Sequence, residues 1–374
     1  MSGVDRVVFV DLARVVAILL MVQGHTLDAL LASEYRTGVA FYAWSFGRGL
    51  TSCLFFFLAG FAFVLATYSL SGERRASATG LRRFRRFALF LLIGYALHSP
   101  VASLGDFTSV RPEKWKAFVA VDALQCLAVT LTVLQVFALR ARSVRQFLLL
   151  SLLTAIAVVT TTPAVARTDW DAVLAPSLAA YLTPGTGSLF PVFPWGAYTL
   201  VGAALGAAYI RAARPGWMET RVLGAIGGAM LIGSFVGARL LWEPLGRTDS
   251  WSTSPNQFLL RAGLVCTIVA VLALLSRRIS RLPAALEAVA QHSLLVYAAH
   301  LCVVYGSAWN RGLRYWYGHG LPFGSAVMWV IILWLAVIAL ANCRHAYRPQ
   351  KMRLLKRITR AAEPRRLGRR LRSA

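Results

Sequence analysis

Ten long apolar stretches constrain the fold of this chain more than any other feature of its sequence. A helix of about 20 apolar residues crosses the hydrocarbon core of a bilayer and satisfies its own backbone N–H and C=O groups there, which an open strand cannot do. The hydrophobic fraction of 57% and the charged fraction of 15% exclude an ordinary soluble enzyme. We therefore predict an all-α, polytopic membrane protein with about ten transmembrane helices. The stretches are residues 7–31, 41–68, 84–104, 117–139, 144–162, 190–210, 222–242, 256–276, 284–307 and 321–343.

The basic residues predict how these helices are oriented. If the stretches alternate in direction, 28 of the 40 Lys and Arg residues lie on the side of both chain ends, and 8 lie in the loops of the other side. Because cytoplasmic loops carry the excess of Lys and Arg, both termini should be cytoplasmic. We predict a transmembrane domain over residues 1–343 and a basic cytoplasmic tail over 344–374 that is largely disordered.

The net charge of +25 is explained by this topology. In a soluble chain such an excess would suggest a nucleic-acid partner. In a membrane protein the same residues set the topology and meet anionic lipid headgroups. We therefore expect membrane lipid, and no nucleic acid, as a partner of the basic loops.

The first apolar stretch carries an unusual stripe of polar residues. Asp11 and Arg14 are three residues apart and can pair on one helix face. His25 lies only about 20° around the helix from Arg14 and about 16 Å further along it, and Asp28 continues the stripe. A structural ion pair and a packing histidine would explain part of this pattern. A polar cavity that runs through much of the bilayer would explain all of it.

Other stretches place polar residues at the depth of His25, near the outer face. Charged groups are costly in hydrocarbon, so such a cluster is a candidate functional site, although a purely structural ion-pair network is the alternative. We expect Asp122 to be the acid that pairs with Arg48 or Arg261, and Asp28 or Asp122 to orient His25. The residues of this predicted acceptor-side cavity are Asp28, Arg48, His98, Asp122, Gln125, Arg261 and His300.

Motifs of soluble enzymes are missing from the sequence. It has no P-loop, no GxSxG, no HExxH and no paired Cys or His spacing, so we predict no metal site. Two pairs of glycines, Gly202 with Gly206 and Gly224 with Gly228, are four residues apart in apolar stretches, as helix packing in membranes requires.

Several segments together resemble the integral-membrane acyltransferase-3 clan, and in particular the bacterial relatives of heparan-alpha-glucosaminide N-acetyltransferase. Arg14, ten residues and His25 resemble the Arg-x10-His signature of the clan's first helix. Relatives usually carry an Arg-Gly pair where this chain has Arg14 and Val15, which leaves Arg14 and His25 in place. The other similar segments are LFFFLAGFAF (54–63), LRRFRRFALF (81–90), VDALQCLAVTL (121–131), FPVFPWGAYTLVGAALG (190–206), TSPNQFLLRAG (253–263) and HSLLVYAAHLCVVYG (292–306).

This resemblance implies a transferase in the bacterial cytoplasmic membrane that takes an acyl group, commonly acetyl, from cytoplasmic acyl-CoA. The acceptor would be a sugar hydroxyl or amine of a glycan or glycolipid at the outer face, and no cofactor would be bound permanently. The catalytic residues would be His25, as the base or as the carrier of the acyl group, with Arg14 and Asp11. The basic residues that would bind the CoA phosphates are Arg14, Arg82, Arg83, Arg85 and Arg86.

A second class of function fits part of the sequence. A transporter or flippase for an anionic lipid or sugar would also have about ten helices and buried arginines. Such proteins often carry matching pairs of helices broken by Gly or Pro, and the sequence shows no such pair.

Overall fold

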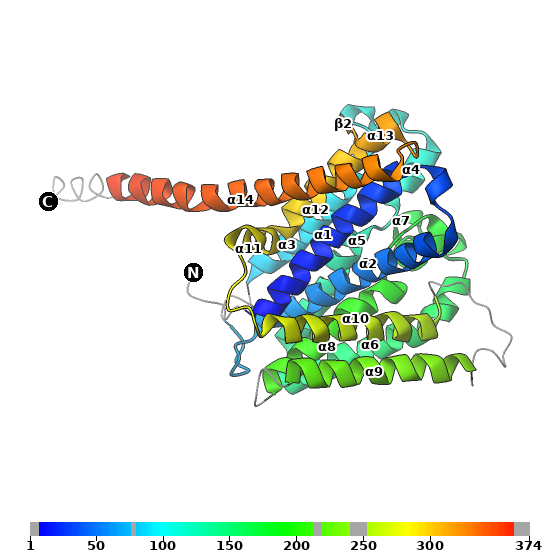
Figure 1. The fold of residues 1–374 in the computed structure, drawn as a ribbon. Coiled ribbons are helices and arrows are strands. Elements are labelled where there is room, and N and C mark those ends of the chain that lie inside the picture. The colour runs from blue at the N-terminus through cyan, green and yellow to red at the C-terminus, as the bar shows by residue number, and fades with distance from the viewer. Residues whose placement is uncertain (1–6, 76–79, 213–217, 240–252, 363–374) are drawn as a thin grey trace.

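The computed structural model describes residues 7–75, 80–212, 218–239 and 253–362, and this part of the chain is almost entirely helical (Figure 1). A two-stranded hairpin of β1 (Gly306–Ser307) and β2 (Asn310–Arg311) is its one named sheet. The helices are α1 (Val8–Leu30), α2 (Gly38–Thr67), α3 (Leu81–Leu97), α4 (Pro112–Val119), α5 (Ala123–Arg140), α6 (Val144–Arg167), α7 (Pro176–Ala179), α8 (Val192–Arg211), α9 (Met218–Gly237), α10 (Pro255–Ser276), α11 (Ala284–Gln291), α12 (Ser293–Val304), α13 (Leu313–Tyr317) and α14 (Phe323–Ala362). Short 3-10 turns lie at 33–35, 104–109, 170–172 and 184–186.

A helix lies on every one of the ten predicted stretches, which confirms the all-α, polytopic fold. In the described part of the chain, α1, α2, α5, α6, α9, α10 and α14 are each long and apolar enough to cross a membrane. The pair α11 and α12 makes an eighth such span if its two halves are taken together, although they meet at an angle of 82°. The remaining two stretches are occupied by α3 and α8.

Three boundaries differ from the prediction. Helix α3 ends at Leu97, before Pro100, because the residues before a proline disfavour helical geometry. The stretch 117–139 is divided between α4 and α5, with Asp122 as the N-cap of α5. Helix α14 continues past residue 343 to Ala362, so 344–362 of the expected tail are helical, and residues 363–374 lie outside the described part.

Glycines allow a very close contact between α2 and α8. A Cβ atom on Gly202 would overlap the backbone of Phe57 in α2, and one on Gly206 would press on Phe61 and Val64. Across the same interface, Gly60 of α2 has no room for a Cβ beside Thr199. The prediction for the α8 glycines is therefore confirmed. In α9 the result is different, because it is Gly227, and not Gly228, that packs closely on α10.

The bundle has a buried centre and an apolar outer surface. Helices α1, α2, α5, α8 and α10 supply most of the buried core. Helices α9 and α14 lie at the edges of the bundle in Figure 1, and α6, α9 and α14 keep large apolar side chains exposed, among them Leu153, Phe235 and Leu335. Apolar side chains exposed along whole helices are typical of a surface that faces lipid. In Figure 1, α1 begins and α14 ends on the same side of the bundle. We refer to this side as the N-terminal end and to the side of α13 as the opposite end.

Candidate functional site

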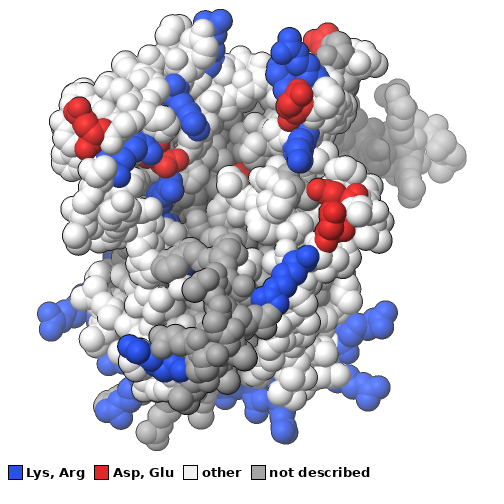
Figure 2. All heavy atoms as spheres, turned by 90° about the vertical axis from the view of Figure 1, so that its right-hand side faces the viewer, with Lys and Arg blue, Asp and Glu red and all other residues white. Residues whose placement is uncertain are grey.

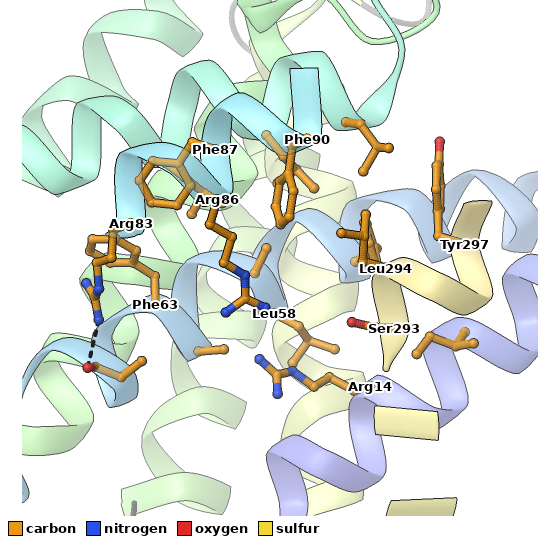
Figure 3. Close-up of a pocket in the computed structure, with 18 residues that line it drawn as sticks. Arg14, Leu58, Phe63, Arg83, Arg86, Phe87, Phe90, Ser293, Leu294 and Tyr297 are labelled. Carbon is orange, nitrogen blue, oxygen red and sulfur yellow. Dashed lines mark hydrogen bonds between the residues drawn. The ribbon is translucent and has the colours of Figure 1, made fainter. Parts of the chain in front are cut away.

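A cavity opens among α1, α2, α3, α5 and α12 toward the N-terminal end. Its walls are mainly apolar, and its basic groups are Arg14, Arg83 and Arg86 (Figure 3). In Figure 3 the guanidinium groups of Arg14 and Arg86 face each other from opposite walls. The apolar and small side chains of the lining are Ile18, Phe55, Leu58, Ala59, Ala62, Phe63, Ala66, Phe87, Phe90, Leu124, Leu127, Leu131 and Leu294.

Asp11 supports Arg14 from one turn away on α1. The Asp11 Oδ1 atom lies 3.7 Å from Nη1 of Arg14, which is the predicted ion pair. The carboxylate offsets part of the cost of holding a guanidinium beside apolar walls. The pair therefore places one basic group of fixed orientation at the cavity.

Arg83 and Arg86 have different surroundings although both contribute to the cavity. Arg83 donates to Thr67 Oγ1 at 2.8 Å, to the Ala66 carbonyl at 2.7 Å and to Gln135 Oε1 at 3.2 Å. These bonds link α3 to α2 and α5, so most of its donors are engaged with protein. The side chain of Arg86 is exposed and points into the cavity.

The other two predicted CoA-binding arginines do not line this cavity. Arg82 and Arg85 lie on the first turns of α3 with exposed side chains, and neither is among the lining residues. The structure thus brings Arg14 together with Arg83 and Arg86.

The break between α11 and α12 shapes the far wall of the cavity. Ser293, the first residue of α12, lines it, and Tyr297 lies one turn further along the same helix. The Tyr297 ring is stacked on Phe55 at a centroid distance of 6.1 Å and contacts the ring of His300 at 5.7 Å. The cavity therefore ends beside the histidines of the predicted acceptor side.

His25 and His300 form a pair of facing imidazoles. Their ring centroids are 5.3 Å apart with an interplanar angle of 71°. His300 is buried, and its Nδ1 lies 2.8 Å from the Val296 carbonyl, so Nδ1 carries the hydrogen and Nε2 keeps its lone pair. Nδ1 of His25 and Nε2 of His300 have no hydrogen-bond partner among the described residues. Two imidazoles with unused nitrogens at one place are suited to exchange protons with a bound group.

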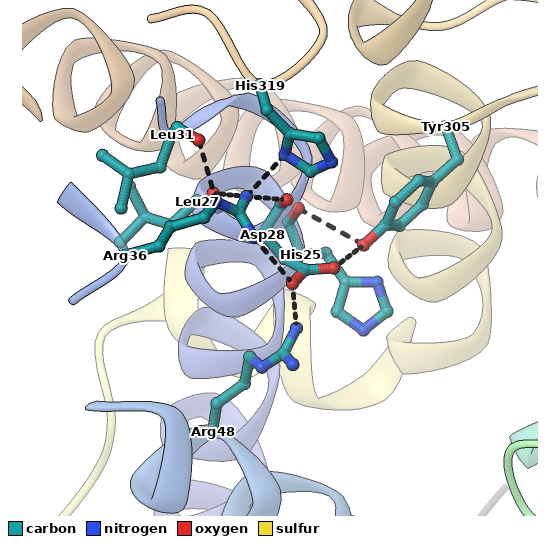
Figure 4. A network of polar contacts seen from close by, with 8 residues as sticks. All are labelled: His25, Leu27, Asp28, Leu31, Arg36, Arg48, Tyr305 and His319. Atoms are coloured by element: carbon teal, nitrogen blue, oxygen red, sulfur yellow. Dashed lines mark hydrogen bonds and ion pairs between the residues drawn. The ribbon is translucent and has the colours of Figure 1, made fainter. Parts of the chain in front are cut away.

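Asp28 is the acid of an ion-pair network next to His25 (Figure 4). Its Oδ1 lies 2.7 Å from Nη1 of Arg48 and 3.9 Å from Nη1 of Arg36, and Tyr305 donates to its Oδ2 at 3.2 Å. The expected pairing of Arg48 with Asp122 is therefore wrong, because α1 itself presents an acid to α2. The Tyr305 ring lies 5.6 Å from that of His25, so the network encloses this histidine.

Asp122 belongs to a second polar cluster on α3, α5 and α12. Its Oδ2 accepts a hydrogen bond from the Tyr297 hydroxyl at 3.3 Å and lies 3.7 Å from Nε2 of His98. Its Oδ1 accepts from the Ala123 N–H at 2.7 Å, which caps α5. One turn along α5, both amide atoms of the buried Gln125 have no partner in the described part of the chain. Tyr297 joins this cluster to His300.

Arg261 is buried on α10 beside Gly49 of α2, and its charge acts on the hydroxyl of Tyr198 on α8. This position between three helices indicates a structural role for Arg261.

Four residues of these networks were not predicted as site residues. Tyr297 lies three residues before His300 and Tyr305 lies five residues after it. A tyrosine in such an apolar stretch is expected to pack between helices, so neither was assigned to the site. Arg36 and His319 lie in two different loops. The side chain of Arg36 links these loops, because its Nη2 lies 2.6 Å from Nδ1 of His319. No spacing in the sequence would have paired two residues of distant loops.

The opposite end of the bundle is hollowed. Figure 2 looks at this end and shows a hollow with basic and acidic side chains around it. The His98 side chain is about one third exposed there, and that of Arg48 is 37% exposed. An apolar cavity with basic groups therefore lies toward the N-terminal end of the bundle, and a hollow with charged side chains around it lies at the opposite end. Within the described residues, no group of three His, Cys, Asp or Glu side chains could hold a metal ion.

No curated protein matches the chain. A family model described as heparan-alpha-glucosaminide N-acetyltransferase, catalytic, matches residues 6–234, which include α1 with Arg14 and His25 as well as α3 and α5. The match extends over more than half of the chain, and the helices that carry the cavity and the histidine site fall largely within it. The protein is therefore a membrane-embedded acetyltransferase that belongs to the heparan-alpha-glucosaminide N-acetyltransferase catalytic family.

Proposed function

We propose that this protein transfers an acyl group, in the first place acetyl, from cytoplasmic acyl-CoA to a sugar amine or hydroxyl at the opposite face of the membrane. The family description names an alpha-glucosaminide as the acceptor and nitrogen as the acetylated atom. A glycan or glycolipid that ends in glucosamine is therefore the first acceptor to test. Acyl-CoA acts as a co-substrate and is released as CoA after each turnover.

The donor side of the proposal rests on the cavity of Figure 3. CoA is strongly anionic, and guanidinium groups bind phosphates through paired N–H donors. Arg14 and Arg86 have their guanidinium groups turned to the cavity, whereas Arg83 is largely engaged by α2 and α5. We assign the contact with the donor to Arg14 and Arg86, and we assign to Arg83 the positioning of α3. The apolar walls between them and Tyr297 would exclude water from the thioester.

The chemical step is assigned to His25. A neutral imidazole nitrogen takes the proton of the acceptor amine or hydroxyl while that atom attacks the thioester carbonyl. A C–N or C–O bond forms, the C–S bond breaks, and the proton passes to the leaving sulfur, which gives the free thiol of CoA. If the imidazole instead carries the acyl group, an acetyl-histidine precedes transfer to the acceptor. The Asp28–Arg48 pair and Tyr305 hold the surroundings of the ring in either route.

One observation carries this proposal. A single helix, α1, presents Arg14 to the cavity near its start and His25 to the facing imidazole and the Asp28 network near its end. The two residues are about 16 Å apart along the helix axis, a distance that an extended pantetheine arm can bridge. A donor held at Arg14 would therefore deliver its acyl group to His25.

Purified protein incubated with labelled acetyl-CoA and glucosamine tests the proposal. The wild type should release CoA and produce labelled acetylated sugar, whereas a flippase would consume no acetyl-CoA. His25→Gln keeps the size of the side chain but loses the basic nitrogen, so its turnover should fall by about 10²–10⁴-fold. Acetyl-CoA should still raise the melting temperature of this variant, which separates lost chemistry from lost folding. Turnover of His25→Gln within a few-fold of the wild type would exclude His25 as the base.

A further inference from the structure

A second basic pocket lies at the N-terminal end, apart from the donor cavity. It is formed where three candidate spans have their ends, because α2 ends at Thr67, α5 ends at Arg140 and α6 begins at Val144. Its lining contains three arginines and, in the part of the chain that the structure describes, no acidic side chain. The lining residues are Tyr68, Gly72, Arg74, Leu139, Arg140, Ala141, Arg142 and Ser143.

The backbone adds to the positive potential of this pocket. Helix α6 has 24 residues, and its first N–H groups and the positive end of its dipole lie at Ser143 and Val144. The negative end of the α5 dipole also lies here, and Arg74 partly neutralises it. Nη1 of Arg74 donates to the Ala138 carbonyl at 2.6 Å and to that of Leu139 at 3.3 Å. Two of the carbonyl groups that would repel an anion are thus occupied.

Tyr68 provides a separate indication of a missing ligand. The residue is only 4% exposed and lines the pocket, yet its hydroxyl has no hydrogen-bond partner among the described residues. The hydroxyl is in the electrostatic field of Arg74 and Arg83, and neither accepts a hydrogen bond. A buried hydroxyl without a partner is costly in a folded protein, and an acceptor oxygen from outside the chain would satisfy it.

We propose that this pocket binds a phosphate ester anion, and that its source is the headgroup of an anionic phospholipid. Arginine side chains, a helix N-terminus and a hydroxyl donor are groups that bind phosphate in proteins. We assign the anion contact to Arg140 and Arg142, and Arg74 adds its charge while it caps α5. Because three spanning helices have their ends around the pocket, it lies at the depth where lipid phosphates are found. Basic pockets between transmembrane helices are typical sites for acidic lipid headgroups. A bound lipid would join the ends of α2, α5 and α6, close to the hydrogen bonds by which Arg83 links α3 to α2 and α5.

Native mass spectrometry and thermal unfolding with phosphatidylglycerol test this site. The wild type should retain phosphatidylglycerol and melt at a higher temperature in its presence, and phosphatidylcholine should have no such effect. Arg140→Gln and Arg142→Gln should each weaken this binding about fivefold, since one basic residue near the membrane surface contributes about 1 kcal/mol. Arg145→Gln is the matched control, because Arg145 is an exposed arginine of the same segment that does not line the pocket. It should bind the lipid as the wild type does.

Tyr68→Phe separates a binding role from a structural one. Without lipid, this variant should melt at or above the wild-type temperature, because the hydroxyl that it removes has no partner. With phosphatidylglycerol, its stabilisation should be smaller than that of the wild type. A further experiment adds inorganic phosphate without lipid. If phosphate raises the melting temperature of the wild type but not that of the Arg140→Gln and Arg142→Gln variants, the anion is a soluble phosphate. If neither probe stabilises the wild type, or if Arg145→Gln loses as much as Arg142→Gln, the pocket is not a phosphate site.

Discussion

Arg83 and Arg86 show how two arginines one helical turn apart acquire different roles. Both line the same cavity, but Arg83 donates hydrogen bonds to α2 and α5, whereas Arg86 is exposed. A guanidinium engaged by protein acceptors stabilises the fold, and one directed into a cavity is available to a ligand. The contacts of each residue, more than its charge, therefore decide whether it belongs to the site.

This difference predicts opposite effects of two matched substitutions. Arg83→Gln should lower the free energy of unfolding by about 1–3 kcal/mol, because it leaves buried acceptors on α2 and α5 without a donor. Arg86→Gln should leave the melting temperature almost unchanged but raise the KM for acetyl-CoA. Thermal unfolding and steady-state kinetics of both variants measure the two effects. Equal effects of the two substitutions on KM would contradict the division of roles.

A pH-dependent contact is predicted at His319, which lies in the loop before α14. Nδ1 of His319 lies 2.6 Å from Nη2 of Arg36, and because a guanidinium can only donate, the imidazole accepts this bond in its neutral form. Partial burial and the charges of Arg36 and Arg314 lower the pKa of His319 in the folded protein, against a smaller opposite effect of Asp28. The unfolded chain therefore takes up this proton at a higher pH than the folded chain does. The contribution of His319 to stability is complete above the unfolded pKa and is lost as the pH falls through the folded pKa.

Melting temperatures measured across this pH range test the contact. The wild type should lose part of its stability on acidification, while His319→Gln, whose amide oxygen can accept the same bond without titrating, should lose less. Identical pH profiles for the two proteins would show that the His319 contact with Arg36 does not contribute.

At the scale of elements, the close contact between α2 and α8 depends on glycines, which have no side chain. A Cβ atom on Gly202 would overlap the backbone of Phe57, so the two helices approach more closely than any other residue would allow. In contrast, a Cβ atom on Gly228 of α9 would meet nothing within 4 Å. The same spacing of glycines thus occurs in both helices, but Gly202 of α8 has a packing role and Gly228 of α9 has none.

Substitution of these two glycines should therefore have unequal effects. Gly202→Val should separate α2 from α8 and lower the free energy of unfolding by about 1–3 kcal/mol or more. Gly228→Val should change it little, since the added methyl groups point into open space. Thermal unfolding in detergent compares the two variants directly. A larger loss in Gly228→Val would mean that the α2–α8 interface is not the tightest contact of the bundle.

The positions of the helices could be predicted from the sequence, because hydropathy is a local property. The angles and contacts between helices could not be predicted, because they depend on packing. The stretch 284–307 was predicted as a single span, yet it is broken at His292, where α11 and α12 meet at 82°. The pattern placed Arg14 and His25 on one face of α1. It did not show that Asp28 would meet Arg48, because that contact depends on how α1 and α2 rotate against each other. Tyr305 entered the site for the same reason, through the packing of α12 against α1.

At the scale of the whole molecule, the two ends of the bundle differ both in charge and in the part of the site that they carry. The donor cavity and the phosphate pocket both lie at the N-terminal end, on the side to which the charge pattern assigns 28 of the 40 basic residues. The histidines and the Asp28 network lie toward the opposite end, where the hollow of Figure 2 opens. An anionic donor and a sugar acceptor would then approach from two different compartments, and the acyl group would cross most of the bilayer along α1.

The two ends of the bundle should therefore be found on opposite faces of the membrane. In a chain with its five cysteines replaced, a single cysteine at Ser71 or at Ser177 reports on one end each, and both positions are exposed. A membrane-impermeant maleimide added to intact cells should label Ser177→Cys and leave Ser71→Cys unlabelled until the membrane is permeabilised, because the loop with Ser71 belongs to the basic side. A permeant maleimide should label both and shows that each cysteine is reactive. Labelling of both positions from outside would overturn the orientation, and with it the assignment of the Arg14 cavity to cytoplasmic acyl-CoA and of His25 to an acceptor on the other face.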